Sequence, residues 1–125
     1  MKNSDFYPAS FIPLVEDAEA CFAAMLESLG MSIQEWHRLT VVDADLDEDR
    51  RDDLMTAWGK YLDDYPPEYD ELPTDLIEKV SSEVVNIYGD MPKDELEYKI
   101  SEYIWRDALE DAEENLLDKA LIREL

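Results

Sequence analysis

The strongest constraint on the fold is an uninterrupted helical pattern at the end of the chain. No Gly or Pro follows Pro92. Apolar residues recur every three or four positions from Leu96 through Ile104 and Leu116 to Leu121, which is the period of an amphipathic α-helix. Such a helix of about 33 residues would extend about 50 Å at about 1.5 Å per residue. The sequence therefore predicts a long C-terminal helix.

Two shorter helices are predicted near the beginning of the chain. Residues 13–29 have apolar positions at helical spacing, with Pro13 at the start and Gly30 just past the end, where these two residue types are favoured. Ser32 and Glu35 have the spacing of a capping box, in which each side chain binds the other's backbone N–H. A short second helix is expected to begin there.

The middle of the chain predicts two more helices. The first extends from residue 43 to residue 65 and is stopped by Pro66. The second begins with Thr74 as N-cap and ends before Gly89. The apolar stripes expected on these helices are Leu54, Trp58, Tyr61, Leu62 and Tyr65 on the first, and Ile77, Val80, Val84, Ile87 and Tyr88 on the second.

The predicted fold class is all-α, with about five helices in one small domain that covers residues 1–125 and a long acidic helix at the C-terminus. Residues 1–12 are expected to form an extended or flexible segment. Hydrophobic residues make up 46% of the chain, enough to offset the conformational entropy lost on folding. The chain is therefore expected to fold despite its charge.

The charge balance excludes several functions. The chain has 33 Asp and Glu against 11 Lys and Arg, a formal net charge of -22. Direct binding to nucleic acid requires clustered basic residues, and anionic membranes would repel the chain. No apolar run has the length of about 18 residues that a spanning helix needs, and the N-terminus does not have the pattern of a signal peptide. We expect a cytoplasmic protein.

The densest acidic stretch, "DADLDEDRRDDL" at residues 43–54, has part of the pattern of a calcium-binding loop. Asp43, Asp45 and Asp47 match the first three ligand positions of an EF-hand. Glu48 replaces the Gly of the sharp turn and Leu54 replaces the closing Glu. A specific calcium site is not expected. Capping and the helix dipole account for two or three of the seven acids, not for all of them.

No catalytic or cofactor-binding motif was found. The chain has one Cys and one His, too few to build a zinc site or a nucleophilic triad. Cys21 is interpreted as a small apolar residue of the first helix and His37 as a surface or half-buried residue. The expectation is a protein that is not an enzyme and that holds no metal or cofactor.

The acidic residues occur in three clusters, within residues 43–53, 63–71 and 107–118. The last helix carries twelve acids from Asp90 onward, or about one per 4 Å, close to the one charge per about 3.4 Å of a DNA strand. A rigid array of carboxylates of this density can imitate phosphates. The candidate partner-binding residues are Asp43, Asp45, Asp47, Glu48, Asp49, Asp52, Asp53, Asp63, Asp64, Glu68, Asp70, Glu71, Glu110, Asp111, Glu113, Glu114 and Asp118.

The end of the chain, in which Trp105 precedes "EDAEENLL" at residues 110–117, resembles the DNA-mimicking antirestriction proteins of phages, of the overcome-classical-restriction type. The pattern covers about the last 35 residues, and the rest of the chain is similar in size, acidity and helical content. The resemblance implies a homodimer whose bent acidic surface occupies the DNA groove of a type I restriction-modification enzyme.

Three functions remain open from the sequence. A DNA mimic would inhibit a restriction enzyme, a CRISPR effector, a nuclease or a nucleoid protein. An immunity or antitoxin protein would instead cover one basic toxin nuclease. In the third alternative the acids only keep a halophilic or housekeeping domain soluble, with no mimicry.

Overall fold

The computed structural model describes the backbone of residues 3–42, 48–64 and 67–124, and the side chains within residues 5–40, 48–60 and 67–120. Every regular element in these ranges is helical, as the sequence predicts. The α-helices are α1 (Ile12–Leu29), α2 (Ile33–His37), α3 (Glu48–Asp64), α4 (Thr74–Tyr88) and α5 (Lys93–Glu124). The short elements are the 3-10 helices η1 (Asn3–Phe6), η2 (Ala9–Phe11) and η4 (Tyr69–Glu71), and the π-helical turn η3 (Arg38–Val42).

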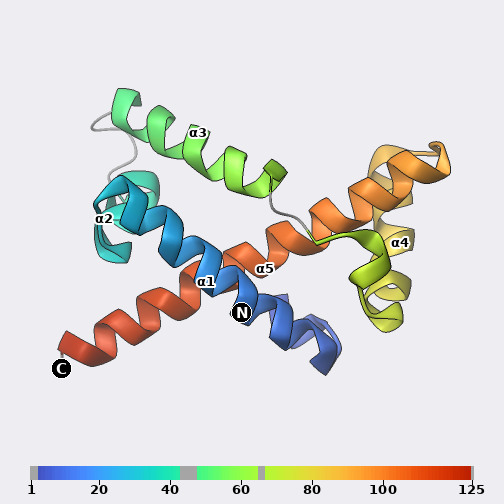
Figure 1. Cartoon of the computed structure of the whole chain (residues 1–125), viewed down its shortest axis with the longest axis horizontal. Helices are drawn as coiled ribbons and strands as arrows, with labels where there is room; N and C mark the ends of the chain where they lie inside the picture. Colours follow the sequence, from blue (N-terminus) through green and yellow to red (C-terminus); the bar gives the residue numbers. More distant parts are fainter. Residues whose placement is uncertain (1–2, 43–47, 65–66, 125) are drawn as a thin grey trace.

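The long helix α5 is the spine of an elongated molecule (Figure 1). Its 32 residues extend about 48 Å, and each of the other four α-helices contacts it. In Figure 1, α1 crosses the middle of α5, α4 lies near the beginning of α5, and α2 lies toward its C-terminal half. The predicted C-terminal helix is therefore confirmed, and it organises the whole fold.

The core lies where α1, α2, α4 and α5 meet. On α5 the buried face includes Ile100, Ile104, Ala108 and Ala112, which follow one another at the four-residue spacing of one side of a helix. The helix that contacts α5 most extensively is α1. Other large buried side chains include Trp105 and Leu109 of α5 and, from the remaining elements, Phe11, Phe22, Met25, Trp36, Leu54, Leu76, Val80 and Val84.

The N-terminal segment is more ordered than predicted. In place of an extended or flexible segment, residues 3–11 form η1 and η2. Phe11 has no exposed surface, and its ring stacks on that of Tyr7 with centroids 4.2 Å apart. Burial of two aromatic rings stabilises a segment that lacks any long helical pattern.

The ends of the first two helices match the sequence signals. Gly30 has a φ of 67°, a left-handed conformation that glycine adopts without steric strain. The Ser32 side chain accepts the backbone N–H of Glu35 at 3.2 Å, which confirms the predicted N-cap. The short second helix then passes into η3 without a break.

Two predictions for α4 are wrong. Thr74 is the first helical residue, and Pro73 occupies the N-cap position without a side-chain cap. The buried face includes Leu76 with Val80 and Val84, whereas Ile87 and Tyr88 are 59% and 44% exposed. The last turn of α4 extends beyond the core, where the ring of Tyr88 lies 5.0 Å from Nζ of Lys99.

Within the ranges that the structure describes, no helix is both long and apolar enough to cross a membrane.

Candidate functional site

The first two turns of α3 carry exposed carboxylates. Glu48, Asp49, Asp52 and Asp53 are all exposed. Glu48 and Asp52 are four residues apart, as are Asp49 and Asp53, so the members of each pair are neighbours on the helix surface at about 5 to 6 Å. Arg50 and Arg51 lie among them and are also exposed. Asp43, Asp45 and Asp47, with the proposed cap of this helix, lie outside the described residues.

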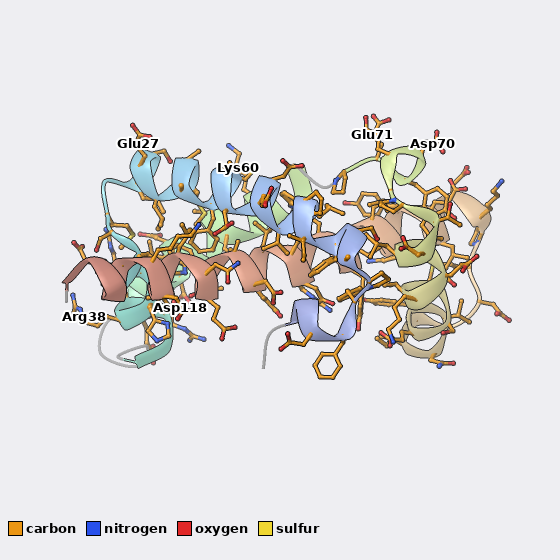
Figure 2. All side chains as sticks on the ribbon, turned by 90° about the horizontal axis from the view of Figure 1, so that it is seen from below. Glu27, Arg38, Lys60, Asp70, Glu71 and Asp118 are labelled. Carbon is orange, nitrogen blue, oxygen red and sulfur yellow. The ribbon has the colours of Figure 1, made fainter. Side chains whose placement is uncertain are left out.

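A second acidic cluster lies on the segment between α3 and α4. Glu68, Asp70 and Glu71 are exposed, and Figure 2 shows Asp70 and Glu71 projecting from the edge of the molecule. Asp63 and Asp64 belong to the last turn of α3, but their side chains lie outside the described residues.

The third cluster forms a line along α5. Glu110, Glu114 and Asp118 are exposed and follow one another at four-residue intervals, which places them about 6 Å apart along the helix axis. We call these three residues the α5 acidic ridge. The helix therefore holds three carboxylates in a row at a fixed spacing.

Asp111 does not belong to this surface, although the sequence predicted it to. It is 2% exposed, because it lies seven residues after Ile104 and three after Ala108, on the buried face of α5. This spacing is visible in the sequence, and it was the signal from which the burial of Asp111 could have been predicted.

The negative charge is not confined to one face of the molecule. Figure 2 shows Glu27, Asp70 and Glu71 along the upper edge, whereas Asp118 lies below them beside α5. Three of the basic side chains pair with acids: Lys93 with Glu97, Lys99 with Glu102, and Lys119 with Glu19. These pairs reduce the positive charge available to balance the exposed acids.

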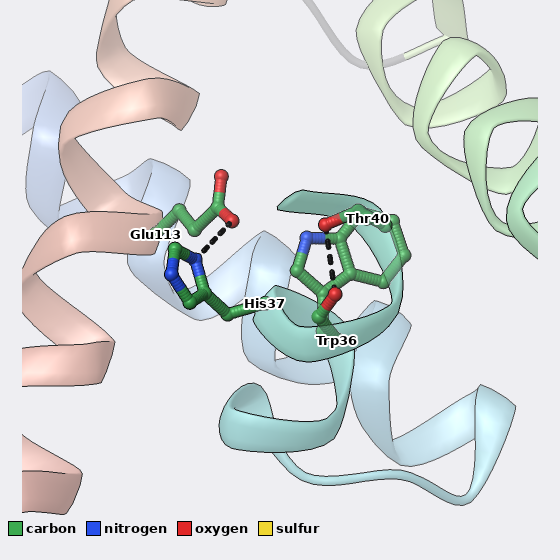
Figure 3. A network of polar contacts seen from close by, with 4 residues as sticks. All are labelled: Trp36, His37, Thr40 and Glu113. Carbon is green, nitrogen blue, oxygen red and sulfur yellow. Dashed lines mark hydrogen bonds and ion pairs between the residues drawn. The ribbon is translucent and has the colours of Figure 1, made fainter. Parts of the chain in front are cut away.

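Glu113 joins α5 to α2 instead of projecting into solvent. Its side chain is 23% exposed and its carboxylate lies 3.9 Å from Nδ1 of His37, as Figure 3 shows. The Trp36 side chain also hydrogen-bonds to it. Burial raises the pKa of the Glu113 carboxyl above its usual range, and the contacts with His37 and Trp36 offset part of that shift. Glu113 therefore has a structural role at the α2–α5 contact.

A second half-buried carboxylate joins α5 to the N-terminal segment. The Tyr7 hydroxyl donates a hydrogen bond to Oδ2 of Asp107 at 2.6 Å. Burial raises the pKa of the Asp107 carboxyl, and the bond from Tyr7 offsets part of the effect. Burial, followed by the contact with Asp107, raises the pKa of Tyr7 as well. This contact was not foreseen from the sequence, since its partners are 100 residues apart.

Asp107 and Glu113 predict how stability depends on pH. Their folded-state pKa values are raised, so the folded chain binds these protons more tightly than the unfolded chain does. The free energy of unfolding is expected to rise as the pH falls from neutral through the folded pKa values, and to level off near the ordinary values of 3.8 and 4.5. Urea unfolding, followed by circular dichroism from about pH 7.5 to 4.5, measures this.

The control for the pH prediction is the double variant Asp107→Asn/Glu113→Gln, which keeps hydrogen-bond acceptors at both positions. Its stability should change less with pH than that of the wild type. Identical pH profiles for the two proteins would show that the buried carboxyls are not the source of the effect.

In the part of the chain with described side chains, no three His, Cys, Asp or Glu residues are placed to hold a metal ion. Comparison of the chain with family models, with curated proteins and with solved structures gave no match. The proposed function therefore depends on the arrangement of the charged residues.

Proposed function

We propose that the protein is a DNA mimic that inhibits a DNA-handling defence enzyme, of the restriction-modification or CRISPR type, by occupying its DNA-binding groove. The observation that carries the proposal is the α5 acidic ridge, in which Glu110, Glu114 and Asp118 are exposed at a regular spacing. A groove that binds DNA presents Lys and Arg to phosphates, and a row of carboxylates offers those side chains similar partners.

The ridge is supported by a rigid frame. The opposite side of α5, which includes Ala108 and Ala112, is buried, and α5 packs against α1. Trp36 and Glu113 hold α2 to α5. The carboxylates therefore keep their spacing before a partner protein binds, and little backbone order has to be gained on binding. Inhibition in this proposal involves electrostatic competition and no chemical step.

A competition experiment tests this function. A fluorescent duplex is bound to a type I restriction-modification enzyme, and the protein is added while the polarisation is recorded. We expect the duplex to be displaced, with an apparent affinity that falls steeply as salt rises, because the contacts are between charges.

A nucleoid protein and a basic toxin nuclease are tested in parallel. Displacement of DNA from none of these proteins, at about a hundredfold excess over the enzyme, would contradict the proposal. A complex with the toxin that excess duplex DNA does not dissolve would favour an immunity protein instead.

A further inference from the structure

The single histidine of the chain lies beside the α5 acidic ridge. His37 belongs to the last turn of α2, and Figure 3 shows its ring directed toward Glu113 on α5. A pocket of about 210 Å³ at this contact is lined by His37, Glu113, Leu117 and two members of the ridge, Glu110 and Glu114. One imidazole therefore shares a small space with three carboxylates.

The ring of His37 is not locked in a neutral form by a hydrogen bond at Nδ1. This atom is hidden from solvent and has no hydrogen-bond partner among the described residues. It lies 3.9 Å from Oε1 of Glu113, beyond the range of about 2.7–3.2 Å for an N–H···O hydrogen bond. A bond at one ring nitrogen is what ordinarily fixes the tautomer of a neutral imidazole. The same geometry therefore accommodates the neutral and the charged ring.

The charged groups that the pocket brings to His37 come from α5. On its own segment, the nearest charged residues in sequence are Glu35 and Arg38. The helices α1 and α3 meet α2 through the uncharged rings of Phe22 and Trp58, which contact Trp36. A change in the charge of His37 is therefore felt first by the carboxylates of α5.

The distances are short enough for this change to reach the ridge. A sphere with the volume of the pocket is about 7 Å across, less than the Debye length of about 8 Å at physiological salt. The His37 side chain is 38% exposed, so protons exchange with solvent. Histidine is also the side chain whose charge ordinarily changes between about pH 5 and pH 8.

We propose that His37 is a pH switch for the α5 acidic ridge, in which protonation of the imidazole lowers the negative potential at Glu110 and Glu114 and weakens the binding of a basic partner. The inference rests on the proposed function, because it concerns the same ridge. By linkage, a basic partner on the ridge disfavours the proton on His37 by the same factor. The partner and the proton therefore compete, and binding strengthens as the pH rises and the proton leaves.

A titration with deca-lysine tests the switch without any partner protein. Lysine keeps its charge from about pH 6.0 to 7.5 because its pKa is about 10.4, so the probe itself does not respond to pH. The peptide is added to the ¹⁵N-labelled full chain at about 50 mM salt, where charges are weakly screened, and the amide signals of residues 110–118 are followed by NMR. We expect the Kd at these residues to be about threefold or more higher at pH 6.0 than at pH 7.5.

The acidic cluster of the η4 segment is an internal control. Glu68, Asp70 and Glu71 are exposed, and this segment packs against the beginning of α5, away from α2. Deca-lysine should bind there with a Kd that changes little over the same pH range. Equal changes in Kd at the two clusters would contradict a switch that acts on the ridge alone.

Two variants fix the charge of the switch. His37→Gln is neutral at both pH values and should bind deca-lysine at the ridge as the wild type does at pH 7.5. His37→Arg is charged at both and should bind as weakly as the wild type does at pH 6.0. Burial also raises the pKa of Glu113, but this carboxyl remains in both variants. A pH dependence that persists in His37→Gln would assign the effect to carboxyls and overturn the proposal.

The competition between proton and partner has a direct readout. The chain has one His, so the ring signals of His37 are identified without ambiguity by NMR. At the pH where half of the wild-type rings are protonated, added deca-lysine should move these signals toward those of the neutral form. Signals that stay in place while the peptide binds the ridge would show that His37 and the ridge are not coupled.

The outcomes distinguish this inference from the proposed function. A Kd at the ridge that does not depend on pH in the wild type would overturn the switch even if the protein displaces DNA from an enzyme. A pH dependence that His37→Gln abolishes, in a protein that displaces DNA from no enzyme, would support the switch and contradict the DNA mimic.

Discussion

Replacing Trp36 with Ala is expected to lower the free energy of unfolding by about 3 to 5 kcal/mol. Trp36 is 2% exposed. Its ring meets that of Phe22 edge to face at 5.4 Å and that of Trp58 at 6.3 Å, so the change leaves a large cavity between α1, α2 and α3. It also removes the hydrogen bond to Glu113, whose carboxylate would stay half-buried with fewer donors.

Urea unfolding followed by far-ultraviolet circular dichroism measures the loss. Trp36→Phe should have a smaller effect because it keeps an aromatic ring, and Phe6→Ala should change stability by less than about 0.5 kcal/mol, since Phe6 is 59% exposed. If Trp36→Ala were no more destabilising than Phe6→Ala, the packing of Trp36 between α1, α2 and α3 would not contribute to the core.

Under the proposed function, neutralising the α5 acidic ridge is expected to slow association with the target enzyme by about tenfold or more, because opposite charges steer the encounter of two proteins. The variant is Glu110→Gln/Glu114→Gln/Asp118→Asn. All three residues are exposed, and removing neighbouring like charges on one helix should slightly stabilise the fold. Surface plasmon resonance at low and high salt measures the rate.

The matched control removes the same charge from α1, through Glu16→Gln/Asp17→Asn/Glu27→Gln, at positions that are also exposed. It should slow association much less than the ridge variant does. Equal losses in the two variants would mean that net charge alone drives binding, and an unchanged rate in the ridge variant would remove α5 from the contact surface.

Much of the fold was predictable because its signals are local. Gly30, the Ser32 cap and the absence of any breaker after Pro92 depend on backbone geometry within a few residues, and the helix ends follow them closely. The order of η1 and η2 depends instead on contacts of Phe11 and Tyr7 with elements distant in sequence, which no local pattern reports.

The candidate site was predictable only in part. Charge clustering found the exposed acids of α3, the η4 segment and the α5 acidic ridge, but composition does not show which carboxylates the packing encloses. Asp111 was recoverable from its spacing after Ile104.

The dual use of α5 restricts how this chain can change over evolution. One side of the helix forms the core and another carries the ridge, so the same residue spacing fixes the direction of both sides around the helix axis. Inserting one residue between Ala112 and Glu114 would turn everything after it by about 100° and bring buried and exposed positions out of register together. Point substitutions that add or remove carboxylates leave the positions around the helix axis unchanged. The number of charges can therefore change among descendants, whereas the number of residues between Ala112 and Glu114 stays constant.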